Sequence, residues 1–322
     1  MTPALAINDL AIDFRSRRGH VRAVDGAALT AACGEVLGVV GESGCGKSTL
    51  GMAIGRLLAP GALRVTGDIL VDGRSVFALD DDALRTLRAE ELGFVFQDPI
   101  GTLDPTRRIG LQVKAALPGR GTDREVEAVL FEVGLSDAGR VARSYPHELS
   151  GGMAQRVSIG MALARRPKIV IADEPTAALD ASIKSQILDL LTGRCRATGA
   201  VLILLSHDLH AIRKYSDRVA VMYGGRLVET GPSNIIFTRP AHPYTAMLLR
   251  ASIADVPIGG RAEPIPGAPP VLEGRCERCS FAPRCEWTEQ RCTAVRPEAR
   301  FIAGREVVCH RAESVIAGVR AS

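Results

Sequence analysis

The sequence lacks any long hydrophobic run and any large excess of one charge. No apolar stretch approaches the roughly 20 residues that a helix needs to span a bilayer, and the first residues, which include Asp9 and Asp13, lack the apolar core of a signal peptide. The 40 basic and 36 acidic residues leave a net charge of +4, which argues against a surface dedicated to nucleic acid. We therefore expect a cytosolic protein that reaches a membrane only through its partners.

A glycine-rich loop between a strand and a helix is the first feature that carries chemistry. Residues 41–49 read Gly-Glu-Ser-Gly-Cys-Gly-Lys-Ser-Thr, which fits the phosphate-loop pattern G-x-x-x-x-G-K-[ST]. The apolar run Val36–Val40 precedes the loop as a predicted buried strand, and a predicted helix from Thr49 to Leu58 follows it. In such a loop the backbone curls around the β- and γ-phosphates, while Lys47 adds positive charge and Ser48 can ligate Mg²⁺.

Polar side chains also end two further predicted strands. Asp173 and Glu174 follow the apolar run Ile169–Ala172; the first is placed to reach Mg²⁺ and the second to orient and deprotonate an attacking water. The alternative is a chance acidic pair on a turn. His207 follows the apolar run Val201–Ser206, and although an isolated histidine is more often structural, its place after the acidic pair favours a role in the site.

A second potential anion site lies about a hundred residues after the glycine-rich loop. Residues 149–156 read Leu-Ser-Gly-Gly-Met-Ala-Gln-Arg, so a hydroxyl and backbone N–H groups point to one spot at the start of a predicted helix. One nucleotide does not need two such sites from one chain. We therefore expect this octet to serve the nucleotide of another chain.

In type and order these segments resemble the motifs of ABC ATPases. The octet Leu149–Arg156 resembles the signature motif, Pro175–Asp180 the D-loop, Phe94–Pro99 the Q-loop and His207 the switch histidine. The D-loop has Ala177 where the family more often has Ser or Thr, which weakens any side-chain hydrogen bond assigned to that position. The resemblance implies an α/β P-loop NTPase fold, the ABC cassette, with a β-subdomain, a RecA-like core and a helical subdomain.

The resemblance also implies how the motifs act. Two cassettes pack head to tail, with ATP between the glycine-rich loop of one and Ser150 and Gly152 of the other. The catalytic residues are expected to be Lys47, Gln97, Glu174 and His207, and the Mg²⁺ ligands Ser48, Gln97 and Asp173. The nucleotide-binding residues are expected to be Gly41, Ser43, Gly44, Cys45, Gly46, Lys47, Ser48, Thr49, Gln97, Ser150, Gly152 and Phe14.

The residue that stacks on the adenine is the least defined of these. In ABC ATPases an aromatic ring some two dozen residues before the phosphate loop has this role, and the candidates are Phe14 and His20. Because Phe14 ends the alternating run Leu10–Phe14, a core role is equally expected for it.

The order of the motifs predicts two domains. An ABC cassette covers residues 1–230, with its helical subdomain at about 82–165, where residues 124–133 carry apolar side chains at helical spacing. Strand–helix alternation over 166–230 favours a parallel sheet. Residues 231–322 form a loop-rich C-terminal extension, with proline-rich stretches such as 264–270 and a cluster of cysteines.

The cysteines of the extension predict a metal centre, because clustered cytosolic cysteines favour metal over disulfide. The sequence around Cys279, Cys285, Cys292 and Cys309 resembles the C-terminal extension of oligopeptide/dipeptide importer ATPases. That resemblance implies a [4Fe–4S] cluster on these four thiolates. Cys276 is then surplus. Since Cys276 and Cys279 have the spacing of a zinc pair, a Zn²⁺ site is an alternative, as are unligated thiols.

The segment His242–Thr245 shares this resemblance and completes a functional prediction. We expect the ATPase subunit of an importer for peptides or similar small solutes, at the cytoplasmic face of the inner (cell) membrane. The expected partners are a second cassette, more often a different chain than a second copy, two integral-membrane permeases and an extracytoplasmic solute-binding protein. The alternatives are a soluble ABC ATPase that acts on DNA or ribosomes and a nucleotide-binding regulatory protein without turnover.

Overall fold

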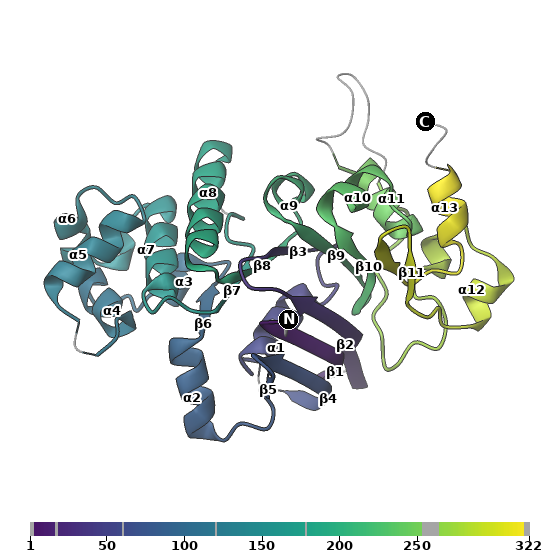
Figure 1. Cartoon of the computed structure of the whole chain (residues 1–322), viewed down its shortest axis with the longest axis horizontal. Helices are drawn as coiled ribbons and strands as arrows, with labels where there is room; N and C mark the ends of the chain where they lie inside the picture. The colour runs from purple at the N-terminus through teal and green to yellow at the C-terminus, as the bar shows by residue number, and fades with distance from the viewer. Residues whose placement is uncertain are drawn as a thin grey trace. The chain divides into compact units, whose positions relative to one another are not determined.

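The computed structural model describes residues 3–16, 19–59, 61–119, 121–177, 179–252 and 264–318 (Figure 1). They belong to two compact units: unit 1 comprises Met1–Ala31, Leu37–Phe77 and Leu205–Ser322, and unit 2 comprises Ala32–Val36 and Ala78–Leu204. Ala178 of the predicted D-loop, and residues 253–263 and 319–322 of the predicted extension, lie outside the described residues. Within the described ranges, no helix is both long and apolar enough to cross a membrane.

An antiparallel sheet of unit 1 is built from the first strands of the chain. Its strands are β1 (Leu5–Ser16), β2 (Gly19–Ala31), β4 (Ala62–Val71) and β5 (Arg74–Ser75), in the order β2-β1-β4-β5 (Figure 1). One face of β1 is buried, with Leu5, Ile7, Leu10 and Ile12 at most 1% exposed. The alternation is interrupted between Ile7 and Leu10, where the pairing of β1 with β2 shifts register, as at a β-bulge.

The second group of strands in unit 1 carries the glycine-rich loop. Here β3 (Val36–Val40, whose first residue belongs to unit 2), buried along its whole length as predicted, runs parallel to β9 (Arg218–Tyr223). Antiparallel pairs then lead from β9 to β10 (Arg226–Pro232), to β12 (Arg305–Val307) and to β11 (Arg300–Ile302). The helical elements of the unit are α1 (Lys47–Ile54), α9 (Leu209–Tyr215), α10 (Ser233–Thr238), α11 (Pro243–Arg250), the 3₁₀ turn η3 (Ala282–Arg284), α12 (Gln290–Ala294) and α13 (Ala312–Gly318).

Unit 2 combines buried strands with most of the longer helices. Its neighbouring strands are β8 (Val201–Ser206, whose last two residues belong to unit 1), β7 (Ile169–Asp173) and β6 (Leu92–Val95), in that order. Its helices are α2 (Asp81–Glu90), α3 (Pro99–Thr102), α4 (Ile109–Ala116), α5 (Asp123–Glu132), α6 (Ala138–Arg143), the 3₁₀ turn η1 (Pro146–Glu148), α7 (Gly151–Leu163) and α8 (Ala181–Thr198). Helices α4 to α7 lie beside one another in Figure 1, and α5 packs against α4, α6 and α7.

The segment predicted to be helical, residues 82–165, differs from that prediction at one place. Leu92–Val95 forms the strand β6, which pairs in parallel with β7 from Leu92 opposite Ile169 to Val95 opposite Ala172. A short apolar run is compatible with a buried strand or with a buried helical segment, so periodicity alone could not identify it. The predicted helix over 124–133 is present as α5, which starts with a capping box between Thr122 and Glu125.

The extension shares unit 1, and a sheet, with residues that precede it. Strand β10 crosses the predicted boundary at residue 230 and pairs with β12, which belongs to the extension. Across this pair Arg305 Nη1 donates a hydrogen bond to Glu229 Oε1 at 3.3 Å, and the two side chains are 1% and 0% exposed. The predicted boundary therefore falls inside a strand and not at a gap between compact units.

Candidate functional site

The glycine-rich loop connects β3 to α1, as the motif requires. Gly46 is the N-cap of α1 with φ 109°, and a Cβ atom there would lie 2.3 Å from the carbonyl oxygen of Ala23. A Cβ atom on Gly41 would lie 2.1 Å from the carbonyl oxygen of Met222. Only glycine fits at either position, because its backbone reaches positive φ without strain and leaves room for the neighbouring chain.

The start of α1 is suited to an anion. Gly46 offers no side-chain cap, and no acidic residue occupies the first turn, so the N–H groups there have no competing carboxylate. By contrast, α2 is capped by the side chain of Asp80 and has Asp81 and Asp82 in its first turn. Lys47 is 7% exposed, and its ammonium donates hydrogen bonds to the carbonyl oxygens of Gly41 and Glu42 at 2.7 and 3.2 Å.

The other predicted site residues of unit 1 lie on strands or directly after one. His207 is exposed and follows β8, just before α9, whose N-cap Asp208 accepts the N–H of Ala211 at 3.1 Å. Phe14 is half-buried within β1, and His20 is exposed on β2. The half-burial of Phe14 agrees equally with a ring that packs in the sheet and with a ring that stacks on adenine. Phe14 and His20 therefore both stay predictions for the adenine-stacking residue.

In unit 2 the acidic pair lies at the end of β7. Asp173 is the last residue of the strand and is 6% exposed. Glu174 follows with φ 47°, a left-handed conformation that is uncommon for residues other than glycine and that occurs often at functional sites. Gln97 is exposed just after β6.

The signature octet forms the start of α7. Ser150 is the N-cap, its hydroxyl accepts the N–H of Met153 at 3.3 Å, and no acidic residue lies in the first turn. A Cβ atom on Gly152 would lie 3.2 Å from Cγ2 of Ile183 in α8, so this glycine lets the two helices approach closely. The exposed N-terminus agrees with anion binding, and the hydroxyl of Ser150 also has an ordinary capping role.

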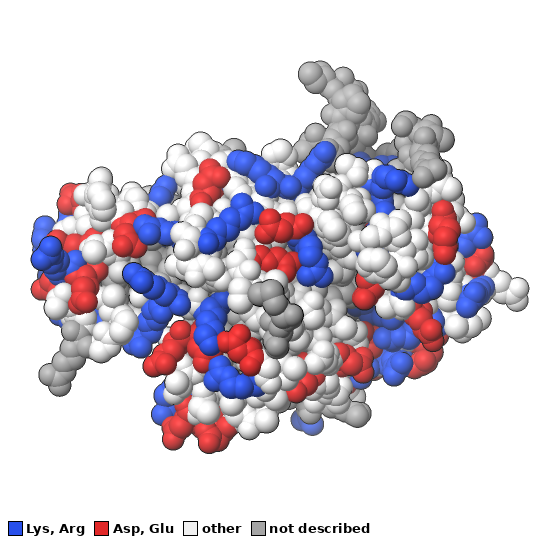
Figure 2. Space-filling view, in the orientation of Figure 1, with Lys and Arg blue, Asp and Glu red and all other residues white. Residues whose placement is uncertain are grey.

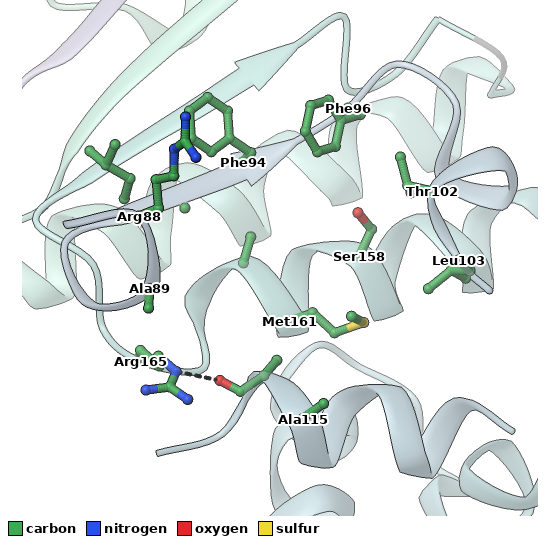
Figure 3. A pocket seen from close by; sticks show the side chains of 14 residues that line it. Arg88, Ala89, Phe94, Phe96, Thr102, Leu103, Ala115, Ser158, Met161 and Arg165 are labelled. Atoms are coloured by element: carbon green, nitrogen blue, oxygen red, sulfur yellow. Dashed lines mark hydrogen bonds between the residues drawn. The ribbon is translucent and has the colours of Figure 1, made fainter. Parts of the chain in front are cut away.

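Unit 2 contains a groove that sequence reasoning missed. A cavity of about 370 Å³ lies between β6, α7 and the end of α4. Phe94 projects from β6 and Phe96 directly follows the strand, with ring centroids 5.9 Å apart; Met161 and Ala115 line the cavity from the two helices (Figure 3). The only signal for it in the sequence was the Q-loop resemblance, because Phe96 directly precedes Gln97.

Arg165, which lines this groove, connects the segment just after α7 to the end of α4 through hydrogen bonds. Arg165 donates hydrogen bonds to the carbonyl oxygens of Ala116 at 3.0 Å and Leu117 at 2.7 Å (Figure 3). These carbonyls end α4, where a cation is favourable. The groove is therefore lined mainly by apolar side chains, together with the two arginines Arg88 and Arg165 (Figure 3).

The four cysteines predicted to hold a cluster lie close enough together for some of the thiols to change the pKa of others. Burial and, to a smaller extent, the neighbouring Cys279, Cys285 and Cys292 raise the pKa of the Cys309 thiol to about 12. The Cys279 N–H also donates a hydrogen bond to the Cys292 carbonyl oxygen at 3.0 Å. All eight cysteines are among the described residues, and none forms a disulfide.

Thiolate donors suit iron–sulfur chemistry, and these thiols lie close enough to interact electrostatically. However, within the described part of the chain no group of three or more His, Cys, Asp or Glu side chains is arranged to hold a metal ion. The donor chemistry thus fits a cluster, whereas the arrangement of the side chains does not form a metal site.

Known proteins match both parts of the chain. Residues 24–177 match the family model described as ABC transporter, and residues 228–292 match the oligopeptide/dipeptide transporter C-terminal region. A putative peptide import ATP-binding protein of Brucella abortus is 41% identical over 314 residues, which cover 95% of this chain and 94% of that protein. The oligopeptide transport ATP-binding protein OppD of Salmonella typhimurium is 39% identical over 313 residues, which cover 95% and 93%.

Solved structures match the cassette. The dimeric ATP-binding cassette MJ0796, in a post-hydrolysis state bound to ADP and Pi, has a TM-score of 0.64 and 27% identity over 71% of this chain and 98% of its own. The protein cbiO1 of Clostridium perfringens has a TM-score of 0.62 and 28% identity over 74% and 91%. The predicted ABC cassette fold is thus confirmed. The chain belongs to the ABC transporter ATPases, in the family of peptide import ATP-binding proteins.

Proposed function

We propose that this chain is the ATP-hydrolysing subunit that energises the import of peptides or similar small solutes through a multi-subunit ABC transporter. The observation that carries the proposal is the similarity to proteins named for peptide import over 95% of the chain, cassette and extension together. The glycine-rich loop, with Lys47 inside it and an uncapped helix behind it, supports the ATPase part of the proposal. The alternative function on nucleic acid is not favoured by these relatives, and basic and acidic side chains are interspersed on the face that Figure 2 shows.

For the nucleotide site we propose the division of roles that the motifs imply. The loop from Gly41 to Thr49 holds the phosphates through backbone N–H groups and Lys47. Mg²⁺, which prefers hard oxygen donors, would be held by Ser48, Asp173 and Gln97 and would neutralise phosphate charge. Glu174 accepts the proton of the attacking water, and His207 contacts the γ-phosphate.

The second half of the site comes from a facing cassette, whose signature serine and glycine complete it. In this chain the corresponding residues are Ser150 and Gly152, at the exposed start of α7. We expect the facing cassette to be a different chain. Native mass measurement of the purified transporter checks this, because a homodimer would give two cassettes of identical mass.

The apolar groove of unit 2 is the proposed docking site for a cytoplasmic segment of a permease. It lies directly beside the Q-loop residue Gln97, so a segment seated there would sense changes at the nucleotide. Ala115 is exposed at the rim and can be replaced without disturbing the core. We expect Ala115→Arg to keep ATP binding and to lose assembly with the permeases. The matched control is Ala128→Arg, also on an exposed alanine of a neighbouring helix but outside the groove.

The decisive experiment is reconstitution of the transporter with its permeases, its solute-binding protein and its second cassette in proteoliposomes. We expect ATP-dependent uptake of a peptide that disappears when this chain carries Gly46→Ala. Peptide uptake that proceeds equally well without this chain would refute the proposal.

For the extension we propose that Cys279, Cys285, Cys292 and Cys309 hold a [4Fe–4S] cluster. The thiolate donor set supports this, as does the proximity of the thiols, because neighbouring cysteines help to raise the pKa of Cys285 and of Cys309. Anaerobic purification followed by iron analysis and visible absorption is the test. A colourless preparation without iron would refute the cluster, and a stoichiometric zinc content would favour a Zn²⁺ site in its place.

A further inference from the structure

The structure assigns Arg284, in the cysteine-bearing extension, as a positioning residue of the nucleotide site that acts through Glu42. This inference rests on the proposed role of the glycine-rich loop in binding ATP. Glu42 is the second residue of that loop. The Arg284 guanidinium donates from Nη1 to Oε2 and from Nη2 to Oε1 of the Glu42 carboxylate, at 2.8 and 3.0 Å, although the two residues are 242 positions apart in the chain. Two parallel bonds of this kind fix direction as well as distance.

Arg284 is itself held rigidly. Its side chain is 5% exposed, its Nε donates to the carbonyl oxygen of Pro266 at 2.7 Å, and its guanidinium lies 5.7 Å from the centre of the Tyr223 ring. A buried guanidinium with a fixed donor direction loses little further freedom when it binds a carboxylate. The arginine therefore acts as a rigid support and not as a surface ion pair.

The extension also holds the backbone of Glu42. The Glu42 N–H donates to the hydroxyl of Tyr244 at 2.9 Å, and the Tyr244 ring lies 5.4 Å from the ring of Phe281. On its other side the Glu42 carbonyl oxygen accepts from Lys47 at 3.2 Å. The residue whose carbonyl contacts the phosphate-binding lysine is thus fixed at its carboxylate by Arg284 and at its N–H by Tyr244.

The charge of this arrangement has a direct consequence for ATP. A carboxylate inside a phosphate loop repels the phosphates of the nucleotide unless a cation offsets its charge. Arg284 supplies that cation from outside the loop, so Lys47 stays available for the phosphates. Without Arg284, Glu42 would repel ATP or draw Lys47 away from it.

The test measures the dissociation constant of MgATP for the full-length chain by calorimetry. We expect Arg284→Gln to raise it about tenfold, as expected for the loss of a charged hydrogen-bond pair. The dissociation constant of Arg284→Lys should lie between those of this variant and the wild type, because lysine keeps the positive charge but cannot form two parallel hydrogen bonds to the carboxylate. Tyr244→Phe, which loses only one hydroxyl, should raise it a few-fold. Arg275→Gln is the control, since Arg275 lies in the same extension and pairs only with the exposed Glu277 among the contacts described.

A double-mutant cycle separates positioning from a general loss of structure. In a Glu42→Gln background, Arg284→Gln should change ATP affinity much less than it does in the wild type, because the repelling carboxylate is gone. Equal effects in both backgrounds would overturn the inference, as would unchanged affinity in a folded Arg284→Gln variant. If Arg284→Gln does not fold, unchanged affinity in both Arg284→Lys and Tyr244→Phe would overturn it. A wild-type chain that fails to bind ATP would instead refute the proposed function.

Discussion

A buried histidine at the start of α11 makes the stability of unit 1 depend on pH. His242 is 1% exposed, and burial lowers its pKa from 6.5 to about 3. Its Nδ1 accepts the N–H of Tyr244 at 3.0 Å, a bond that requires an unprotonated Nδ1. The backbone N–H of His242 donates to Oε2 of Glu229 at 3.0 Å. We predict that the folded protein loses stability as the pH falls below the pKa of an unfolded histidine.

The sign and size follow from proton linkage. Between pH 6.5 and about 3 the unfolded chain binds a proton at His242 that the folded chain does not bind, so acid favours unfolding. Each pH unit within this window is worth about 1.4 kcal/mol. From about pH 7.5 to about pH 5.5, His242 should therefore lower the free energy of unfolding by about 1.4 kcal/mol.

The assay is urea unfolding at both pH values, followed by the fluorescence of Trp287, the only tryptophan, which lies in unit 1 with His242. The comparison is His242→Gln, whose amide oxygen can still accept the Tyr244 N–H but does not titrate. All other titrating groups contribute equally to both proteins, so the difference between the two pH dependences isolates His242. Identical pH dependence in the wild type and the variant would refute the reasoning.

Three further predictions concern single residues. Glu174→Gln should keep ATP affinity but lower the hydrolysis rate about 10²- to 10⁴-fold, because the base is lost; near-normal turnover beside an inactive partner cassette would contradict the assignment. Gly46→Ala should abolish nucleotide binding in an ATP titration, because residue 46 has φ 109° and its Cβ atom would lie 2.3 Å from the carbonyl oxygen of Ala23. Wild-type affinity in this variant would contradict the prediction and would show that the loop relaxes easily. Arg305→Met should lower the free energy of unfolding by about 3–5 kcal/mol, because it leaves the Glu229 carboxylate buried without its cation; a loss in urea unfolding below about 1 kcal/mol would contradict this.

Strands with chemistry at their ends were the most predictable parts of the fold. Val36–Val40, Ile169–Asp173 and Val201–Ser206 are each short and apolar, and the structure contains all three as β3, β7 and β8. Their continuous apolar character reflects burial on both faces, which a local sequence window captures. The start of the loop helix was also placed to within a few residues, whereas its end was not: α1 stops at Ile54, short of the predicted Leu58.

Features that depend on distant pairs could not be predicted. Nothing near Glu42 indicates Arg284, because neither residue belongs to a periodic pattern and the contact forms only in the folded chain. The groove beside Phe94 and Phe96 likewise needs α4 and α7 packed near β6 before it exists. The roles of the site residues themselves stay predictions, since they depend on bound nucleotide and on a facing cassette.

The long separation between the phosphate loop and the arginine that supports it also has a consequence for biosynthesis. A ribosome adds roughly 5–20 residues per second, and 242 residues separate Glu42 from Arg284. The loop therefore leaves the ribosome about 12–50 s before its support does. During that interval the Glu42 carboxylate has no Arg284 to offset its charge. We therefore expect the chain to reach its full affinity for ATP only when synthesis is almost finished.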